Sequence, residues 1–525
     1  MGATQLTEVC RDIVPRSNGI LAENPLPSCF RFGKIGQPAG LNQFMTFPSP
    51  TEPVRQRERA RSRPARPRKT APPQRQTTFQ WIVLVMFALL LVASIALTVW
   101  KIGPAPVRAL IAIALLAIIG AKHIDVLRLS TRRSRPLLLL GLAMAVLGTV
   151  VSVFNGTSFA VILSQLIEIH VQAAINIVLG GAVIMICGRK AVLQCILFAV
   201  GLSSLFAIAQ AVGFEPAWTL RGLIGNLQGE VFEKYGFFYD RRPMGLSLSP
   251  ILLATQLCLA FAAVGVYYER KIRPVQYAAV QGKVFENGVL IALVLFIIVC
   301  FVSGNRSPIL GALVFFGIYT IFRRPKYFII LAPFAVVLAV WILPQVISLA
   351  ADTGSRVVQT GDASSEGRAT LIYYGLLLFK GHPFGFGFDF DPTRYWQTYW
   401  SDVQDMPNPG AIIVYPLHNY ALMMLCFYGF PLLFFLPTIF KMLWQQRTLL
   451  VYFVPYVIHI AFHNTGPFWN DFMIWFVTAL GTSVAVRSQP ETAPNGRPPL
   501  RDAKGSPDDQ TGKSRRRSST SFQPR

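Results

Sequence analysis

Long apolar runs, separated by short polar or basic segments, fill the chain from about residue 79 to about residue 486. Most of the runs approach the roughly 20 residues that a helix needs to cross a bilayer. The fourth run is long enough to tilt or bend, whereas the second, eighth, eleventh and twelfth are short. We predict membrane helices over 79–99, 105–121, 136–154, 159–187, 191–213, 245–267, 287–304, 307–322, 327–349, 417–440, 449–463 and 471–486.

The composition agrees with a bundle of helices in a membrane. Of the 525 residues, 53% are hydrophobic and 14% are charged, whereas soluble domains contain about 45–50% apolar and about 25% charged residues. A soluble enzyme, a disordered chain, a coiled coil and a disulfide scaffold are therefore excluded for the main body. The seven cysteines form no C-x-x-C pair and indicate no disulfide or zinc framework. The predicted fold is an all-α polytopic membrane bundle of about twelve transmembrane helices.

The distribution of Lys and Arg between the turns predicts the orientation of this bundle. Cytoplasmic loops of membrane proteins carry an excess of these residues. Every even-numbered turn is basic, whereas the three short turns on the other side, 154–158, 303–307 and 463–470, carry only Arg306 between them. The basic turns are 122–135, 188–190, 269–288, 323–326 and 441–447. Both termini should therefore lie in the cytoplasm.

Two basic tails flank the predicted membrane domain, 79–486. Residues 1–78 hold 13 Lys and Arg against 5 Asp and Glu, and residues 487–525 hold 9 against 4, within a net charge of +24. Such segments lack an apolar face on which to fold. Nucleic-acid binding is one interpretation, but basic flanks beside membrane spans are common, which favours disordered cytoplasmic arms in contact with membrane lipid. We expect no nucleic-acid partner. The first 25 residues lack the apolar run of a signal peptide, and either Met1 or Met45 fits as the start.

Two connections on the predicted outer side are long, 214–244 and 350–416. Loops beyond about 12–15 residues are usually functional or disordered. Both are rich in Trp, Tyr, Phe and Gly, which favours packed structure at the outer membrane surface. The second contains apolar residues at helical spacing over 367–381, which predicts an amphipathic helix before the tenth span. Any chemistry should lie on this side.

The second loop and its flanks carry a recognisable order of motifs. An Arg precedes the predicted loop helix, a Pro-x-Gly-x-Gly turn follows it, His-Asn-Tyr opens the next span, and a Gly lies in the middle of that span. These residues are Gly367, Arg368, His382, Pro383, Gly385, Gly387, His418, Asn419, Tyr420 and Gly429. Upstream, SGNRSPILGAL (303–313) and RRPMGLSLSP (241–250) add two arginine-containing turns. In these motifs the chain resembles the superfamily of O-antigen ligases and of O-antigen and exopolysaccharide polymerases.

The resemblance implies glycan transfer on the periplasmic face of the bacterial inner membrane, in the biosynthesis of lipopolysaccharide or exopolysaccharide. The donor would be a glycan on a polyprenyl pyrophosphate such as undecaprenyl pyrophosphate, and the acceptor another glycan or a lipid A core. The resemblance also implies an inverting, metal-independent glycosyltransferase without a cofactor. Ligase and polymerase differ in the acceptor, and nothing in the sequence separates them.

The resemblance assigns roles to individual residues. Arg306 and Arg368 would bind the pyrophosphate, with Arg242 or Arg241 helping, and His418 would activate the acceptor hydroxyl. The chemistry fits, because Arg offers planar donors that stay charged and the pKa of His is tunable near neutral pH. The alternatives are arginines that anchor span ends at the interface and an interfacial histidine packed on Tyr415.

Other polar residues suggest a cavity behind these groups. We expect Asn419, His463 and Glu168 to line it. Glu168 belongs to a polar face of the fourth span whose other explanation is hydrogen bonding between helices; its members are Gln165, Glu168, Gln172 and Asn176. The Asp389-Phe390-Asp391 segment and the pair His459 and His463 are weak metal motifs, and we predict no metal site.

The rival hypothesis is a polytopic transporter or flippase for lipid-linked oligosaccharides. Such proteins are expected to show an internal repeat and broken helices near the midplane of the membrane. The halves of this chain show no convincing similarity, and its largest outer loop lies asymmetrically before the tenth span. The sequence therefore favours the glycosyltransferase.

Overall fold

The computed structural model describes residues 77–102, 105–229, 241–272, 279–323, 363–469 and 471–482. The two basic tails apart from residues 77 and 78, the ninth predicted span (327–349) and parts of both long outer loops lie outside these residues.

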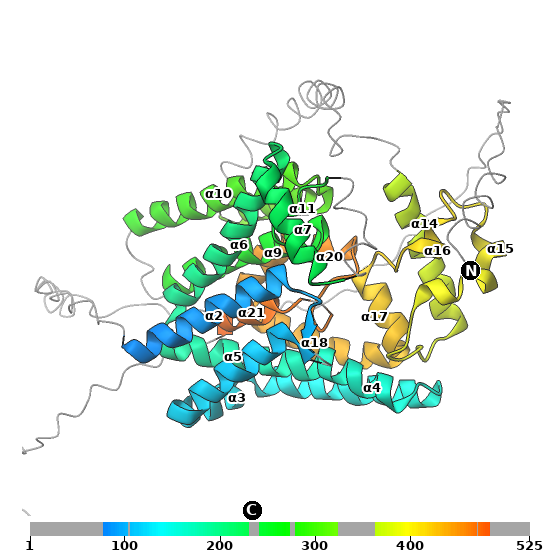
Figure 1. Cartoon of the computed structure of the whole chain (residues 1–525), viewed down its shortest axis with the longest axis horizontal. Coiled ribbons are helices and arrows are strands. Elements are labelled where there is room, and N and C mark those ends of the chain that lie inside the picture. Colours follow the sequence, from blue (N-terminus) through cyan, green and yellow to red (C-terminus); the bar gives the residue numbers. More distant parts are fainter. Residues whose placement is uncertain are drawn as a thin grey trace, which may run out of the picture. The chain divides into compact units, whose positions relative to one another are not determined.

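The described chain is an all-α bundle whose helices are long and apolar enough to cross a membrane (Figure 1). Five helices qualify by length and composition, or six if one bent pair counts as a single span. They are α2 (Thr78–Ala96), α3 (Val107–Phe154), α4 (Phe159–Gln165) continued through η2 (Leu166–Val171) into α5 (Gln172–Cys187), α6 (Arg189–Ala211) and α9 (Pro250–Ile272). Their outer faces expose large apolar residues, such as Leu142 at 60% and Leu205 at 66%, as expected for helices in contact with lipid. The membrane fold is confirmed, and the count of twelve spans is not.

Several predicted spans appear as shorter or merged helices. The second and third both fall within α3, whose backbone leaves the helical conformation at His123 (φ −139°, ψ 52°). The predicted turn at 122–135 is otherwise helical, because its Lys, Arg and Leu residues are good helix formers. The seventh, eighth, eleventh and twelfth spans correspond to α10 (Ala279–Val302), α11 (Arg306–Arg323), the series α19 (Arg447–Leu450), η7 (Val451–Phe453) and α20 (Val454–Ala461), and α21 (Met473–Thr482).

The core lies where α2, α5, α9 and α21 pack together. Phe87 of α2 and Phe476 of α21 meet edge to face with ring centroids 5.0 Å apart, and both are buried. Gly180 of α5 lies so close to α21 that an added Cβ would lie 3.1 Å from Phe476. Small residues at such crossings let membrane helices approach closely.

A buried arginine joins the start of α3 to the junction between η2 and α5. Arg108 is 1% exposed, and its guanidinium carbon lies 3.6 Å from the ring centroid of Phe472. With the Gln172 amide oxygen turned toward it, Arg108 Nε donates a hydrogen bond of 3.1 Å to that oxygen. Glu168 lies near Arg108 and forms an ion pair of 3.4 Å with Lys101, in the two-stranded hairpin of β1 (Lys101–Ile102) and β2 (Ala105–Pro106).

The second outer loop contains the predicted helix. It is α14 (Ala363–Gly381), which ends at the same residue as the prediction and packs against α15 (Trp396–Val403), α16 (Ala411–Val414) and α17 (Tyr420–Tyr428). The turn η5 (Pro392–Arg394) lies between them in sequence, and the buried Tyr374 hydroxyl of α14 donates to the Pro392 carbonyl at 2.7 Å. In the first outer loop, α7 (Glu215–Asn226) packs on α6.

The tenth predicted span is broken rather than straight. After α17 the chain bends by 113° at Gly429 and continues as η6 (Phe430–Phe435) and α18 (Leu436–Gln445). Gly429 has φ +70°, and a Cβ there would lie 2.1 Å from the carbonyl carbon of Phe384. Only glycine fits both the backbone angle and the close approach. The Pro-x-Gly-x-Gly turn therefore packs directly against the break.

Candidate functional site

Arg306 opens α11, and the turn before it is fixed by its neighbours. Gly304 has φ +69°, which reverses the chain after α10. The buried Asn305 side chain donates to the Pro250 carbonyl at 3.0 Å and to the Ser303 hydroxyl at 2.8 Å. The turn is thus fastened to the first residue of α9, and Arg306 is held, half-buried, at the start of α11.

Behind Arg306, one hydroxyl joins two histidines. The Ser307 Oγ lies 2.9 Å from His459 Nδ1 and 3.2 Å from His463 Nε2. On its other side, His459 Nε2 lies 3.2 Å from the Ile251 carbonyl and 3.1 Å from the Thr255 hydroxyl. All these side chains are buried except that of Ile251, which is half-buried. We call His459, Ser307 and His463 the histidine–serine chain; it links α9, α11 and the end of α20.

The hydrogen-bond partners determine which ring nitrogens carry protons. Because the Ile251 carbonyl only accepts, His459 Nε2 donates to it, and a neutral His459 then accepts at Nδ1 from the Ser307 hydroxyl. The Ser307 oxygen in turn accepts from His463 Nε2. This leaves a lone pair on His463 Nδ1, a buried atom without a hydrogen-bond partner in the described chain. His463 therefore offers an unused acceptor.

His418 lies beside His463, with ring centroids 6.1 Å apart. Its Nδ1 donates to the Pro416 carbonyl at 2.7 Å, so Nε2 of the neutral ring carries the free lone pair. Asn419 holds the histidine in place: its side-chain oxygen accepts from Leu422 N at 2.9 Å and caps α17, while its amide donates to the Ala461 carbonyl at 3.0 Å. The first turn of α17 is thereby tied to the end of α20.

Burial and the positive charges of two arginines lower the pKa values of these histidines. Burial, and then the positive charge of Arg368, lower the pKa of His418, although the hydrogen bond to Pro416 raises it. Burial lowers the pKa of His463 well below the ordinary value, and the charges of Arg368 and Arg242 contribute. Both histidines are therefore neutral at physiological pH. Arg368, Arg242, His418 and His463 come from four separate segments and lie within electrostatic range of one another.

The remaining expected site residues have other partners. Arg241 has φ +47° and forms an exposed ion pair with Glu215 at 2.5 Å. Glu168 contacts Lys101 and lies near Arg108, and Gln172 on the same polar face bonds to Arg108, which matches the interhelical alternative for that face.

The Pro-x-Gly-x-Gly turn serves the backbone of α17. Gly385 and Gly387 have φ of +88° and +80°. The amides of Phe386 and Gly387 donate to carbonyls in the last turn of α17, and Phe430 N donates to the Pro383 carbonyl at 2.7 Å. The adjacent Asp389 and Asp391 both face Arg394, at 2.9 and 3.8 Å. Across the ranges that the structure describes, no three His, Cys, Asp or Glu side chains gather to form a metal site.

Sequence reasoning missed Ser307 and Thr255 and gave His459 only a weak metal motif. The spacing of His459 and His463 does predict that they share a helix face. The sequence does contain one signal for the histidine–serine chain: a hydroxyl-bearing residue, Ser307, directly follows Arg306. On α11 this hydroxyl contacts the rings of both His459 and His463.

Comparison with known proteins adds an independent result. Residues 291–436 match the family model described as O-antigen ligase, and this match contains Arg306, Arg368, His418, Asn419 and Gly429. It confirms the resemblance. A search of curated proteins gave no match.

Proposed function

We propose that this chain, whose residues 291–436 match the O-antigen ligase family, transfers glycan from a polyprenyl-pyrophosphate donor to a sugar hydroxyl at the periplasmic face of the inner membrane. Members of the O-antigen ligase and polymerase family transfer lipid-linked glycans to acceptor substrates, which is the general function that the match implies. The observation that carries the finer proposal is the convergence of two arginines, Arg368 of α14 and Arg242 ahead of α9, with two neutral histidines at the start of α17 and the end of α20.

The arginines would bind the pyrophosphate of the donor. Arg368 and Arg242 are cations close to the histidines, and Arg306 is placed beside the histidine–serine chain by its neighbour Ser307. Arg makes bidentate, charge-assisted hydrogen bonds to phosphate oxygens. Neutralising the pyrophosphate also stabilises the charge that develops on it as it leaves.

His418 would accept the proton of the acceptor hydroxyl. Its Nε2 lone pair is available, because Nδ1 donates to Pro416. The acceptor oxygen attacks the anomeric carbon of the donor, the bond from that carbon to the phosphate oxygen breaks, and lipid pyrophosphate leaves with the bonding electron pair. The hydroxyl proton passes to Nε2. A single displacement of this kind inverts the anomeric configuration, and the arginines take the role of a metal in charge neutralisation.

The test is transfer by the purified full chain in vesicles, with a polyprenyl-pyrophosphate oligosaccharide, EDTA and no nucleotide sugar. We expect longer glycans on the same lipid, or glycan on an added lipid A core, and nearly complete loss in His418→Ala and Arg368→Ala. Arg394→Ala is the matched control, because Arg394 lies in the same outer loop but pairs with Asp389 and Asp391.

Each outcome bears on the proposal. Extension of the donor glycan would identify a polymerase, and transfer only to lipid A core a ligase. A retained anomeric configuration would rule out the single displacement, and full activity in His418→Ala would rule out this base. Absence of transfer to either acceptor would contradict the proposal and favour transport, to be tested in sealed vesicles.

A further inference from the structure

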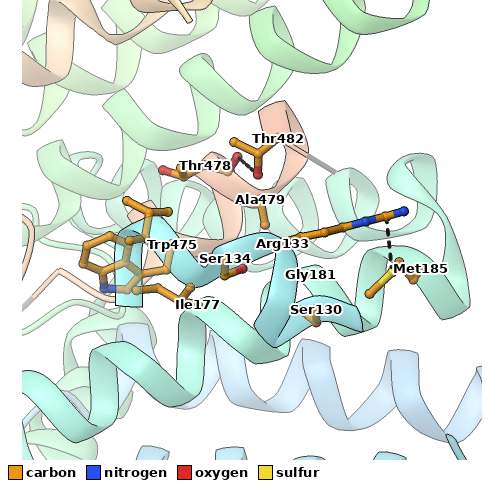
Figure 2. Close-up of a pocket in the computed structure, with 11 residues that line it drawn as sticks. Ser130, Arg133, Ser134, Ile177, Gly181, Met185, Trp475, Thr478, Ala479 and Thr482 are labelled. Carbon is orange, nitrogen blue, oxygen red and sulfur yellow. Dashed lines mark hydrogen bonds between the residues drawn. The ribbon is translucent and has the colours of Figure 1, made fainter. Parts of the chain in front are cut away.

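A small cavity lies between α3, α5 and α21, and it shares no residue with the arginine and histidine site. Figure 2 shows Ser134 and Arg133 of α3 below Thr478 and Thr482 of α21, with Trp475 at one side and Met185 at the other. Its walls combine apolar and hydroxyl-bearing residues: Ser130, Arg133, Ser134, Leu137, Ile177, Gly181, Met185, Trp475, Thr478, Ala479 and Thr482.

The hydroxyls that line this cavity differ in whether they already make hydrogen bonds. The Ser130 hydroxyl donates to the Val178 carbonyl at 2.6 Å, and that of Thr482 donates to the Thr478 carbonyl at 3.2 Å. The hydroxyls of Ser134 and Thr478 take part in no hydrogen bond within the described ranges, and both line the cavity from different helices. They are therefore two available donors that face one space.

The charge around the cavity is positive. Arg133 lines it, and none of the lining residues that the structure describes is acidic. Arg133 belongs to the most basic predicted cytoplasmic turn, 122–135, which holds five Lys and Arg against Asp125 alone. The lining residues Met185 and Thr482 lie at the ends of α5 and α21 that the same orientation directs toward the cytoplasm. The cytoplasmic leaflet carries anionic lipid, and basic pockets between membrane helices on this side bind such headgroups.

We propose that this cavity binds an anionic phospholipid of the cytoplasmic leaflet. The phosphate would accept hydrogen bonds from Ser134 and Thr478 and would lie beside the Arg133 guanidinium. The adjoining apolar wall of Leu137, Ile177 and Trp475 would contact the acyl chains. The headgroup of a zwitterionic lipid would bring its own cation close to Arg133, and the two positive charges would repel. The cavity should therefore select lipids with net negative charge.

The experiment uses the full chain purified from vesicles of phosphatidylcholine with phosphatidylglycerol, and counts retained lipid by native mass spectrometry. We expect phosphatidylglycerol to be retained in preference to phosphatidylcholine. The double variant Ser134→Ala, Thr478→Val should lower its retention about tenfold, the effect of losing hydrogen bonds to a charged group. Arg133→Gln should do the same. Arg128→Gln is the matched control, since Arg128 lies on the same turn, pairs with Asp125 and is absent from the cavity.

Thermal unfolding of each variant shows whether the bundle is intact, and only variants that unfold within a few degrees of the parent are compared. Equal retention of the two lipids would overturn the proposal, as would an equal loss in Arg128→Gln. Displacement of phosphatidylglycerol by inorganic phosphate at millimolar concentration would also overturn it, because the cavity would then be a site for free anions. Failure of glycan transfer has no bearing on these outcomes.

Discussion

Removal of the Ser307 hydroxyl tests the histidine–serine chain directly. Ser307→Ala deletes the hydrogen bonds of 2.9 Å to His459 and 3.2 Å to His463. Two buried ring nitrogens then lose their partner, and each unsatisfied group costs about 1–3 kcal/mol. Since the other ring nitrogen of His463 has no hydrogen bond within the described chain to hold the ring, the ring can turn. For the two nitrogens together we therefore expect a loss near the lower end of this range, about 2 kcal/mol of folding stability.

The effect on transfer should be separate from the effect on stability. We assign the proton acceptor to His418, and a positioned base contributes about 10²–10⁴-fold in rate. His463 would only accept a hydrogen bond from a neutral sugar hydroxyl, worth about 1.4 kcal/mol or roughly tenfold. Ser307→Ala should therefore raise KM for the acceptor glycan about tenfold and leave KM for the donor nearly unchanged.

The assay measures initial transfer rates over a range of each substrate, together with thermal unfolding in the same detergent. Ser307→Thr keeps a hydroxyl and should recover most of the acceptor affinity. Thr320→Val is the control on α11, because the Thr320 hydroxyl bonds to the Phe316 carbonyl of its own helix. If Ser307→Ala destabilises the protein but leaves the KM for the acceptor glycan unchanged, His463 does not bind the acceptor. The histidine–serine chain would then have only a structural role.

The same contacts give three further expected outcomes. Because burial and Arg368 hold the pKa of His418 below its ordinary value, the transfer rate should fall only as pH drops below about 6.5. In Arg368→Gln the residual activity should begin to fall at a higher pH than in the parent, and an unchanged pH dependence would contradict an effect of Arg368 on His418. Since His418 and His463 are harder to protonate in the folded protein than in the unfolded one, unfolding measured by denaturant should become easier as pH falls below about 6.5, and a stability that rises there would contradict the sign. Gly429→Ala should yield little folded protein by size-exclusion chromatography, because a Cβ would lie 2.1 Å from the Phe384 backbone, whereas Gly201→Ala, with open space around it, should behave as the parent.

The membrane fold could be predicted because it depends on local properties of the chain. Apolar length gives helices that can cross a bilayer, and helical spacing predicts α14 to its final residue, Gly381. The merged α3 and the break at Gly429 could not be predicted in the same way. In α3 the two predicted spans are separated only by a kink at His123, because the residues after it return to the helical conformation, and the break at Gly429 depends on contact with a turn that lies more than 40 residues earlier in the chain.

The candidate site shows a similar division. Motif spacing named Arg306, Arg368 and His418, but spacing cannot show which nitrogen of a histidine is free. That information depends on the carbonyls of Pro416 and Ile251, which are backbone atoms without a sequence signature. The ion pair between Arg241 and Glu215 of α7 could not be predicted either, because it joins two segments that no periodicity in the sequence relates.

The buried Arg108 has a consequence for the order in which the protein is made. Its contacts within the described chain include Gln172, about sixty residues later, and Phe472, near the end of the described ranges. An arginine in the middle of a membrane helix costs about 2.5–3.5 kcal/mol on insertion, though less near an end, where it can reach water. We therefore expect Arg108 to stay hydrated at the membrane surface during synthesis, and α3 to reach its final position only when Phe472 is available to contact the guanidinium. Chains truncated before Phe472 should be degraded faster than the full chain, and Arg108→Leu should reduce that difference.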